Sequence, residues 1–199
     1  AGYNSYVNGQ KAWNGVAILS KEKLEITNTS IPKYDDPNAR FIETEIQLKK
    51  IKKHIKLINI YLPNGNPIET EKFDYKIEWM KKFNKYIQEL KSKNTPIIIS
   101  GDFNVIPSDD DVYSPENFKN DACAHPLTRE QYRILINMGF TDLVKHFVEG
   151  KTNWTFWGYR GGGWQKGNGL RIDHFLTTAN ITDLIKKVEV NREPRGWEK

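Results

Sequence analysis

Six apolar side chains recur at spacings of three and four residues between positions 71 and 92, and this is the strongest local pattern in the chain. Spacings of this kind place side chains along one face of an α-helix. We therefore predict a helix from about Glu71 to Ser92, with a Lys-rich face turned to solvent. The residues of its apolar face are Phe73, Ile77, Met80, Phe83, Ile87 and Leu90.

Apolar segments with the character of β-strands lie on both sides of this helix. Residues 41–48 alternate so that Ile42, Thr44, Ile46 and Leu48 share one face. Residues 55–62 are apolar on both faces, which is typical of a strand buried on both sides. The run 96–100 is β-branched and predicts a central strand. Strands that alternate with helices predict an α/β architecture.

A second helix is predicted to begin at Thr128, in the second half of the chain. Gln131 follows three residues later, Leu127 and Tyr132 are spaced as a hydrophobic staple, and Gly139 comes just after the expected end. The preceding residues 105–124 are rich in Pro, Asp, Ser and Asn and predict a long loop. Residues 153–159 and 170–177 are expected to form two strands that bracket a glycine-rich stretch.

Composition limits the class of protein. A chain of 199 residues with 38% hydrophobic and 12% aromatic residues can bury a core, and without repeats or linkers we expect a single domain over 1–199. One cysteine, Cys123, excludes an internal disulfide and a cysteine-based zinc site, so a cytoplasmic location is the default expectation. No apolar run approaches membrane-spanning length, so neither a signal peptide nor a membrane partner is expected. The net charge of +5 suits a polyanionic partner, but a charge of this size is more commonly just a solvated basic surface.

Polar side chains interrupt three of the predicted strands or follow them directly. These segments are 59–64, Ser100-Gly101-Asp102-Phe103-Asn104, and 170–176. A polar side chain left unpaired in such a setting costs about 1–3 kcal/mol. Each therefore needs either a partner or a function.

These motifs and their order along the chain resemble those of the exonuclease III and abasic-site endonuclease branch of the endonuclease/exonuclease/phosphatase superfamily. The resemblance covers essentially the whole chain. GDFN occurs across the superfamily, phosphatases included, whereas two other matching stretches are typical of the branch that acts on DNA. The stretches that narrow the match to that branch are GQKAWNGVA at 9–17 and WTFWGYR at 154–160, and REPR at 192–195 is a further match to the family.

The resemblance implies catalytic roles for Tyr61, Asp102, Asn104 and Asp173. Asp102 would orient or deprotonate the attacking water, and Asn104 would donate to the scissile phosphate, because two residues apart in an extended segment they project the same way. The Tyr61 hydroxyl would approach the phosphate, and Asp173 would fix a catalytic histidine. The alternatives are an Asx turn at Asp102, a buried aromatic at Tyr61 and an ion pair between Asp173 and Arg171.

The resemblance also implies a set of DNA contacts. Phe156, Trp157 and Ile172 would form the apolar pocket for an extruded abasic sugar, although an aromatic cluster is equally typical of a core. Further contacts to DNA would come from Asn64, Arg160, Trp164, Lys166 and Arg171, with an exposed glycine-rich turn as the alternative. The four histidines show no metal-ligand spacing and are expected to be structural.

Magnesium, with manganese as an alternative, is the cofactor that the resemblance implies. Members of the family carry a metal-binding Glu before the stretch that matches Gly2, and a closing Ser-Asp-His motif after the stretch that matches Arg195. Neither has a counterpart here. We therefore expect a chain truncated at both ends. Asp102 and Asn104 would then hold an ion weakly. The implied fold is a four-layer sandwich of two packed mixed β-sheets flanked by helices, lacking terminal strands.

The expected function is magnesium-dependent hydrolysis of DNA phosphodiesters by a monomeric DNA-repair nuclease, at abasic sites and at 3′ ends of double-stranded DNA. Two alternatives stay open. A phosphatase acting on inositol phosphates or lipid headgroups would use the same GDFN chemistry. A catalytically inactive DNA-binding fragment is consistent with the missing Glu and His.

Overall fold

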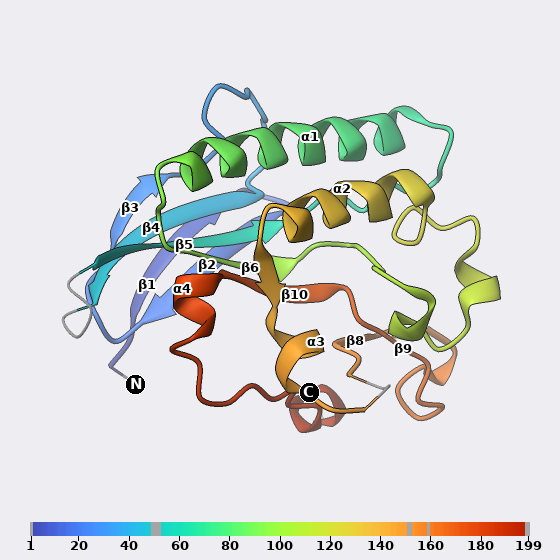
Figure 1. The fold of residues 1–199 in the computed structure, drawn as a ribbon. Coiled ribbons are helices and arrows are strands. Elements are labelled where there is room, and N and C mark those ends of the chain that lie inside the picture. The colour runs from blue at the N-terminus through green and yellow to red at the C-terminus, as the bar shows by residue number, and fades with distance from the viewer. Residues whose placement is uncertain (1, 49–52, 151–152, 159, 198–199) are drawn as a thin grey trace.

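A six-stranded mixed sheet forms the centre of the molecule, with its strands in the order β3-β4-β5-β6-β10-β7 (Figure 1). The computed structural model describes residues 2–48, 53–150, 153–158 and 160–197, without the side chains of residues 48, 53 and 160. The strands of the central sheet are β3 Glu25–Asn28, β4 Phe41–Leu48, β5 Lys53–Tyr61, β6 Ile97–Asp102, β7 Phe140–Asp142 and β10 Asp173–Thr178.

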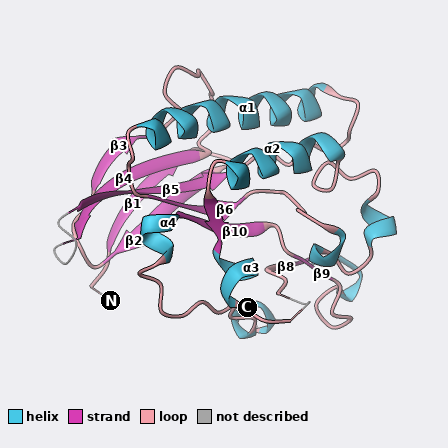
Figure 2. Cartoon of the chain, viewed as in Figure 1, coloured by secondary structure: helices cyan, strands magenta, loops and turns pink. Residues whose placement is uncertain are grey.

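Two long helices lie side by side over one face of this sheet, as Figures 1 and 2 show. They are α1 Glu71–Ser92 and α2 Pro126–Asn137, and the short helices are α3 Leu143–Phe147 and α4 Ala179–Thr182. The apolar stripe of α1 packs on the sheet residues Ile58, Ile60, Ile99 and Leu176 to form the main core. In the described ranges, no helix is both long enough and apolar enough to cross a membrane.

A β-hairpin covers part of the opposite face. It consists of β1 Asn4–Gly9 and β2 Gly15–Ser20, and the Nδ2 of Asn59 in β5 donates to the carbonyl of Ala17 in β2 at 2.8 Å. A third small sheet pairs β8 Phe156–Trp157 with β9 Gly169–Leu170. The predicted α/β class, with helices outside and sheet packed on sheet, is confirmed.

The strongest sequence patterns gave correct element bounds, and the weaker ones did not. Helix α1 and strand β4 have the predicted bounds. Helix α2, however, begins at Pro126 rather than after Thr128, because Pro fits the first helical position and the His125 Nδ1 accepts from the Leu127 N–H at 3.2 Å. Thr128 is buried inside the helix, where its hydroxyl donates to the Ala122 carbonyl at 2.7 Å.

The two predicted late strands are also different from expectation. Only Phe156–Trp157 is a strand within the described residues 153–158, residue 159 lies outside the described part of the chain, and residues 170–177 are divided between β9 and β10. The division falls at Arg171 and Ile172. The Arg171 N–H donates to the Asp111 carbonyl at 2.8 Å and not to a neighbouring strand, and this interrupts the strand.

Candidate active site

Three of the predicted catalytic residues lie in one row across the central sheet. β5 runs parallel to β6 and pairs Tyr61 with Asp102, while β10 runs antiparallel to β6 and pairs Asp173 with Asp102. Paired residues of neighbouring strands project from the same face. Since the alternate residue Ile60 belongs to the core under the helices, the row points to the opposite face, where the hairpin lies. The structure therefore brings Tyr61, Asp102 and Asp173 together.

The close pairing of β5 and β6 at this row requires a glycine. Gly101 has a φ of +129°, and a Cβ at this position would lie 2.0 Å from the Ile60 carbonyl oxygen and 2.6 Å from the Asn59 Oδ1. A side chain here would push the strands apart. The glycine of the GDFN motif thus sets the spacing between Tyr61 and Asp102.

Asn104 reaches the site through a turn, and the prediction of an extended segment is wrong. Its φ is 48°, and its N–H donates to the Asp102 Oδ1 at 2.8 Å, which is the Asx turn considered as the alternative. The Asn104 side chain is 5% exposed. Its Nδ2 donates to the Leu62 carbonyl at 2.9 Å, and its Oδ1 accepts from the Asn64 Nδ2 at 3.1 Å. The turn therefore joins Asn104 to the loop that follows β5.

The pKa values of the two carboxyl groups in the row are both raised. Burial and the neighbouring Asp173 raise the pKa of Asp102 to about 7. Burial also raises the pKa of Asp173, although the Thr155 hydroxyl, which donates to its Oδ2 at 2.6 Å, opposes this shift. Asp102 can therefore take up and release a proton near neutral pH, as a general base must.

Two further side chains hold the row in place, and the sequence analysis did not single them out. The guanidinium of Arg40 lies 5.0 Å from the centre of the Tyr61 ring, and its Nη1 donates to the Tyr61 carbonyl at 3.0 Å. Thr155 accepts the backbone N–H of Asp173 at 3.1 Å in addition to its bond with the carboxylate. Thr155 lies in the matching stretch WTFWGYR, and this stretch could have identified it. No local sequence pattern identifies Arg40.

Hollows flank the row on both sides. One of about 390 Å³ lies between the hairpin and the ends of β5 and β6, and is lined by Ala17, Tyr61 and Asp102 among others. Another of about 500 Å³ is bordered by Thr155, Asp173 and Phe175. Both have space for a phosphate group and its neighbours.

The described residues supply part of a metal site. No cluster of three or more His, Cys, Asp or Glu side chains suited to a metal occurs within the described ranges. Asp102 fits as one ligand, because Mg²⁺ commonly takes only one or two protein carboxylates plus water and phosphate oxygens. The Asn104 oxygen already accepts the amide of Asn64 in a buried position, so Asn104 is not supported as the second ligand.

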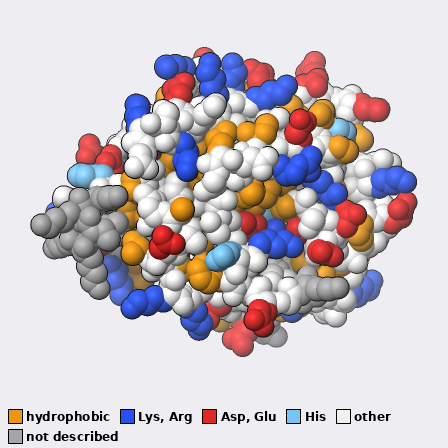
Figure 3. Space-filling view, in the orientation of Figure 1, with side chains coloured by type: hydrophobic (Ala, Val, Ile, Leu, Met, Phe, Trp, Pro, Cys, Tyr) orange, Lys and Arg blue, Asp and Glu red, His pale blue; other side chains and the backbone are white. Residues whose placement is uncertain are grey.

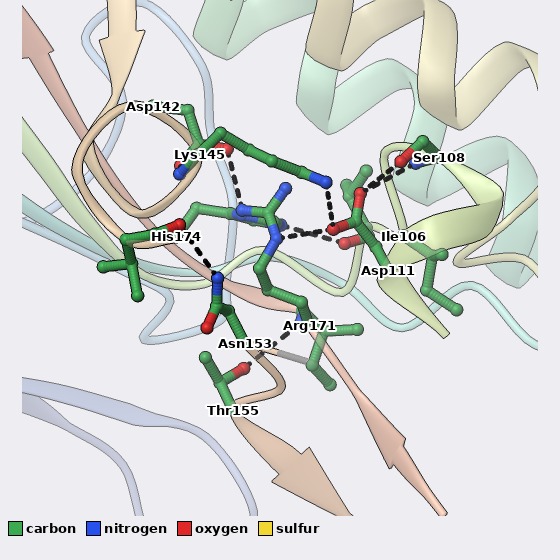
Figure 4. Close-up of polar contacts among 12 residues, drawn as sticks. Ile106, Ser108, Asp111, Asp142, Lys145, Asn153, Thr155, Arg171 and His174 are labelled. Carbon is green, nitrogen blue, oxygen red and sulfur yellow. Dashed lines mark hydrogen bonds and ion pairs between the residues drawn. The ribbon is translucent and has the colours of Figure 1, made fainter. Parts of the chain in front are cut away.

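The prediction that Arg171 contacts DNA is wrong, because this side chain is 1% exposed and is held by a buried polar cluster (Figure 4). Its Nε donates to the Asp111 Oδ1 at 2.7 Å, and its Nη1 donates to the Asp142 Oδ2 at 2.7 Å. The same Nη1 lies 2.8 Å from the His174 Nδ1. Asp173 pairs with Thr155 instead, so the alternative ion pair between Asp173 and Arg171 does not form.

The other predicted DNA contacts differ in exposure. Trp157 is 2% exposed and packs edge-on against Trp164, with ring centres 4.8 Å apart, so the structure does not support its predicted contact with a sugar. Phe156 and Trp164 are half-buried, whereas Lys166 and Asn64 are exposed. The side chain of Arg160 lies outside the described part of the chain.

His174 gives the cluster a pH-dependent contribution to stability. Burial and the adjacent Arg171 lower the pKa of His174 to about 4, so the folded protein holds a neutral ring whose Nε2 donates to the Val105 carbonyl at 2.9 Å. A folded pKa below the unfolded value of about 6.5 stabilises the protein above pH 6.5, and this stabilisation is lost as the pH falls towards 4. Between about pH 7.5 and 5 we expect a loss of about 2 kcal/mol from this group.

Urea denaturation of wild type and His174→Leu at several pH values measures this contribution. Asp102 titrates with the opposite sign, because its folded pKa is raised, so the difference between the two proteins isolates the histidine. His174→Leu should be less stable at pH 7.5 and should lose less stability on acidification. Parallel curves for the two proteins would show that His174 is not the titrating group.

Comparison with known proteins places these features in a family. The sequence profile of the Endonuclease/Exonuclease/phosphatase family matches residues 1–193. The DNA-(apurinic or apyrimidinic site) endonuclease of Dictyostelium discoideum is 32% identical over 181 residues, which cover 89% of this chain and 48% of the relative. Exodeoxyribonuclease III of Haemophilus influenzae is 30% identical over 213 residues, covering 100% of this chain and 77% of the relative.

Solved structures agree. An AP endonuclease from Archaeoglobus fulgidus superimposes with a TM-score of 0.89 at 30% identity, and the match covers 99% of this chain and 75% of that one. The 3′ phosphatase NExo from Neisseria, bound to a product DNA hairpin, gives a TM-score of 0.88 at 29% identity, with 100% and 75% covered. This chain thus spans about half of the Dictyostelium relative and about three quarters of the others. It belongs to the endonuclease/exonuclease/phosphatase family.

Proposed function

We propose that this chain carries the phosphodiesterase site of a DNA-repair nuclease that cleaves double-stranded DNA at abasic sites and at 3′ ends. The observation that carries the proposal is the row of Tyr61, Asp102 and Asp173, beside which Asn104 is fixed by a turn. Relatives named as an AP endonuclease and as exodeoxyribonuclease III, at 32% and 30% identity, support DNA as the substrate.

The geometry supplies the parts that in-line attack on a phosphodiester requires. Asp102, with a pKa of about 7, positions the attacking water and takes its proton. The Tyr61 hydroxyl donates to phosphoryl oxygens as charge develops on them, together with the Asn104 Nδ2 hydrogen that is not given to the Leu62 carbonyl. Asp173, held by Thr155, keeps a second carboxyl group beside Asp102 and maintains its raised pKa.

We also propose that magnesium, with manganese as a substitute, supports the reaction. Asp102 is the described side chain that would hold the ion, together with phosphate oxygens and water. When bound, the ion would neutralise charge on the phosphate and the leaving group. Removal of divalent ions with a chelator should abolish cleavage, and added Mg²⁺ or Mn²⁺ should restore it.

The test compares four substrates with the same protein: a duplex with one abasic site, a duplex with a recessed 3′ end, a duplex with a 3′ phosphate, and a phosphoinositide. The third is included because NExo, a structural neighbour, is a 3′ phosphatase. Cleavage of the DNA substrates in the presence of Mg²⁺ supports the proposal. Release of phosphate from the phosphoinositide alone overturns it, and DNA binding without any cleavage supports an inactive DNA-binding protein.

Binding to DNA should weaken steeply with salt, because each phosphate contact releases counterions. The net charge is +5, but on the face in Figure 3 Lys and Arg are interspersed with Asp and Glu. If about three phosphates are neutralised, affinity should fall about 40-fold between about 50 and 200 mM salt. Fluorescence anisotropy with a labelled abasic duplex measures this slope, and affinity independent of salt would contradict DNA as the partner.

A further inference from the structure

Helix α1 carries a lysine on the face that otherwise forms the hydrophobic core. Lys76 is 0% exposed and lies among Phe73, Ile77 and Met80 on that face. Among the ion pairs of the described residues, none joins Lys76 to a carboxylate. Burying an ammonium group without a paired charge is costly, so such a residue needs a specific set of acceptors.

The acceptors of Lys76 belong to the two loops that form the candidate site. Its Nζ donates to the Pro63 carbonyl at 3.0 Å and to the Asn104 carbonyl at 2.8 Å. Pro63 immediately precedes Asn64, whose side chain donates to the Asn104 Oδ1. One buried ammonium group therefore joins the loop after β5 to the turn after β6, from the side opposite to the row.

The loop is shaped to fit the lysine. Gly65 has a φ of +86°, and a Cβ there would lie 2.5 Å from the Lys76 Cδ and 3.1 Å from its Cβ, so the backbone passes directly over the lysine stem. On the other side of the loop, the Asn66 Oδ1 accepts from the Ala122 N–H at 2.9 Å, and its Nδ2 donates to the Asp121 Oδ2 at 3.0 Å. The loop is thus held between Lys76 and the segment 121–122.

The positive charge of Lys76 also affects the candidate site. Burial lowers the pKa of Lys76 to about 8, with Asp102 and Asp121 opposing the shift and Arg40 adding to it. The ammonium form therefore predominates at neutral pH. Its positive charge favours the carboxylate form of Asp102 at the site.

From these contacts we infer that Lys76 is a positioning residue for phosphodiester cleavage: it fixes the Asn64 loop relative to the Asp102–Asn104 turn, and so sets where Asn104 meets the phosphate. The expected effect on the rate of cleavage rests on the proposed function. The expected effect on the positions of the two loops rests on the hydrogen bonds of Lys76 alone. A misplacement of a donor by about 1 Å can cost about 100-fold in rate without preventing binding. The effect should therefore fall on the rate of the bound complex rather than on affinity.

The experiment compares Lys76→Met, which keeps most of the apolar stem of the side chain but removes its donors, with Lys76→Arg, which keeps donors and charge. Lys81→Met, at an exposed lysine of the same helix, is the matched control. Two measurements are made on each protein. The first is the ¹H–¹⁵N spectrum of the Asn64 and Asn104 side-chain amides in the free protein. The second is single-turnover cleavage of an abasic duplex, with the Kd for that duplex determined separately.

In Lys76→Met the two amide signals should shift towards the positions of exposed asparagines, and cleavage by the bound complex should fall about 100-fold with Kd changed less than about threefold. Lys76→Arg should recover most of both losses, and Lys81→Met should match wild type. If Lys76→Met does not fold, Gly65→Ala, which displaces the lysine stem, should produce the same amide shifts.

The outcomes separate this inference from the proposed function. If the wild-type protein cleaves no DNA, the proposed function fails, and the amide signals alone decide whether Lys76 holds the two loops. Unchanged amide signals in Lys76→Met and Gly65→Ala overturn the inference. It is also overturned if Lys76→Met lowers rate and affinity equally, or if Lys76→Arg recovers neither signal nor rate, because a general packing defect would do the same.

Discussion

Asp102→Asn is expected to lower the rate of cleavage of an abasic duplex about 10³-fold, with the Kd for DNA changed less than about threefold. An amide cannot take a proton from water, but its oxygen can still accept the Asn104 N–H, so the turn after β6 should persist. The substitution also removes repulsion between Asp102 and Asp173. Because this carboxylate is buried beside another, the variant should be no less stable than wild type at pH 8.

Single-turnover kinetics and urea denaturation of the same preparations test this expectation. Asp110→Asn is the control, since it makes the same change of charge at an exposed position and should leave rate and stability unaltered. If Asp102→Asn keeps more than about a tenth of the wild-type rate, a base at this position is not needed, since such a base typically contributes about 10²–10⁴-fold. An equal fall in both variants would point to net charge rather than to the carboxylate.

The sequence predicted those parts of the fold that local patterns determine. Helix α1 could be bounded correctly because six apolar residues repeat at helical spacing over 22 residues. Strands β4 and β6 are marked by alternation and by a β-branched run. Only the resemblance suggested that Tyr61, Asp102 and Asp173 converge. Sequence alone does not show which strands pair, and it is the register of β5, β6 and β10 that places them in one row.

The features that could not be predicted depend on partners distant in the chain. Asn104 adopts a left-handed turn whose side chain is held by Leu62 and Asn64, about forty positions earlier. Lys76 was detectable in principle, because it interrupts the apolar face of α1, but its acceptors are backbone carbonyls that no sequence pattern shows. The roles of the site residues stay predictions until the variants are measured.

Arg171 illustrates the same limit, since a basic residue beside a catalytic aspartate is as typical of a DNA contact as of a buried ion pair. Its partner Asp111 lies 60 positions earlier, and the Arg171 guanidinium helps to hold the pKa of that carboxyl at about 2. It also lowers the pKa of Asp142. The cluster joins the loop before α2 to strand β10, which carries Asp173, through the contacts of Arg171 with Asp111 and His174.

Arg171→Met is therefore expected to lower the free energy of unfolding by about 3–5 kcal/mol at pH 7, because it leaves the carboxylate of Asp142 without its ion-pair partner and that of Asp111 with Lys145 alone, at 3.0 Å. The deficit should narrow as the pH falls towards 4, since Asp111 and Asp142 can then take up protons in the folded variant. Urea denaturation at pH 7 and pH 4 measures both effects. Arg133→Met, at an exposed arginine of α2, should change stability by less than about 0.5 kcal/mol. A deficit in Arg171→Met below about 1 kcal/mol, or one that does not depend on pH, would mean that Lys145 and water rather than Arg171 compensate the two carboxylates.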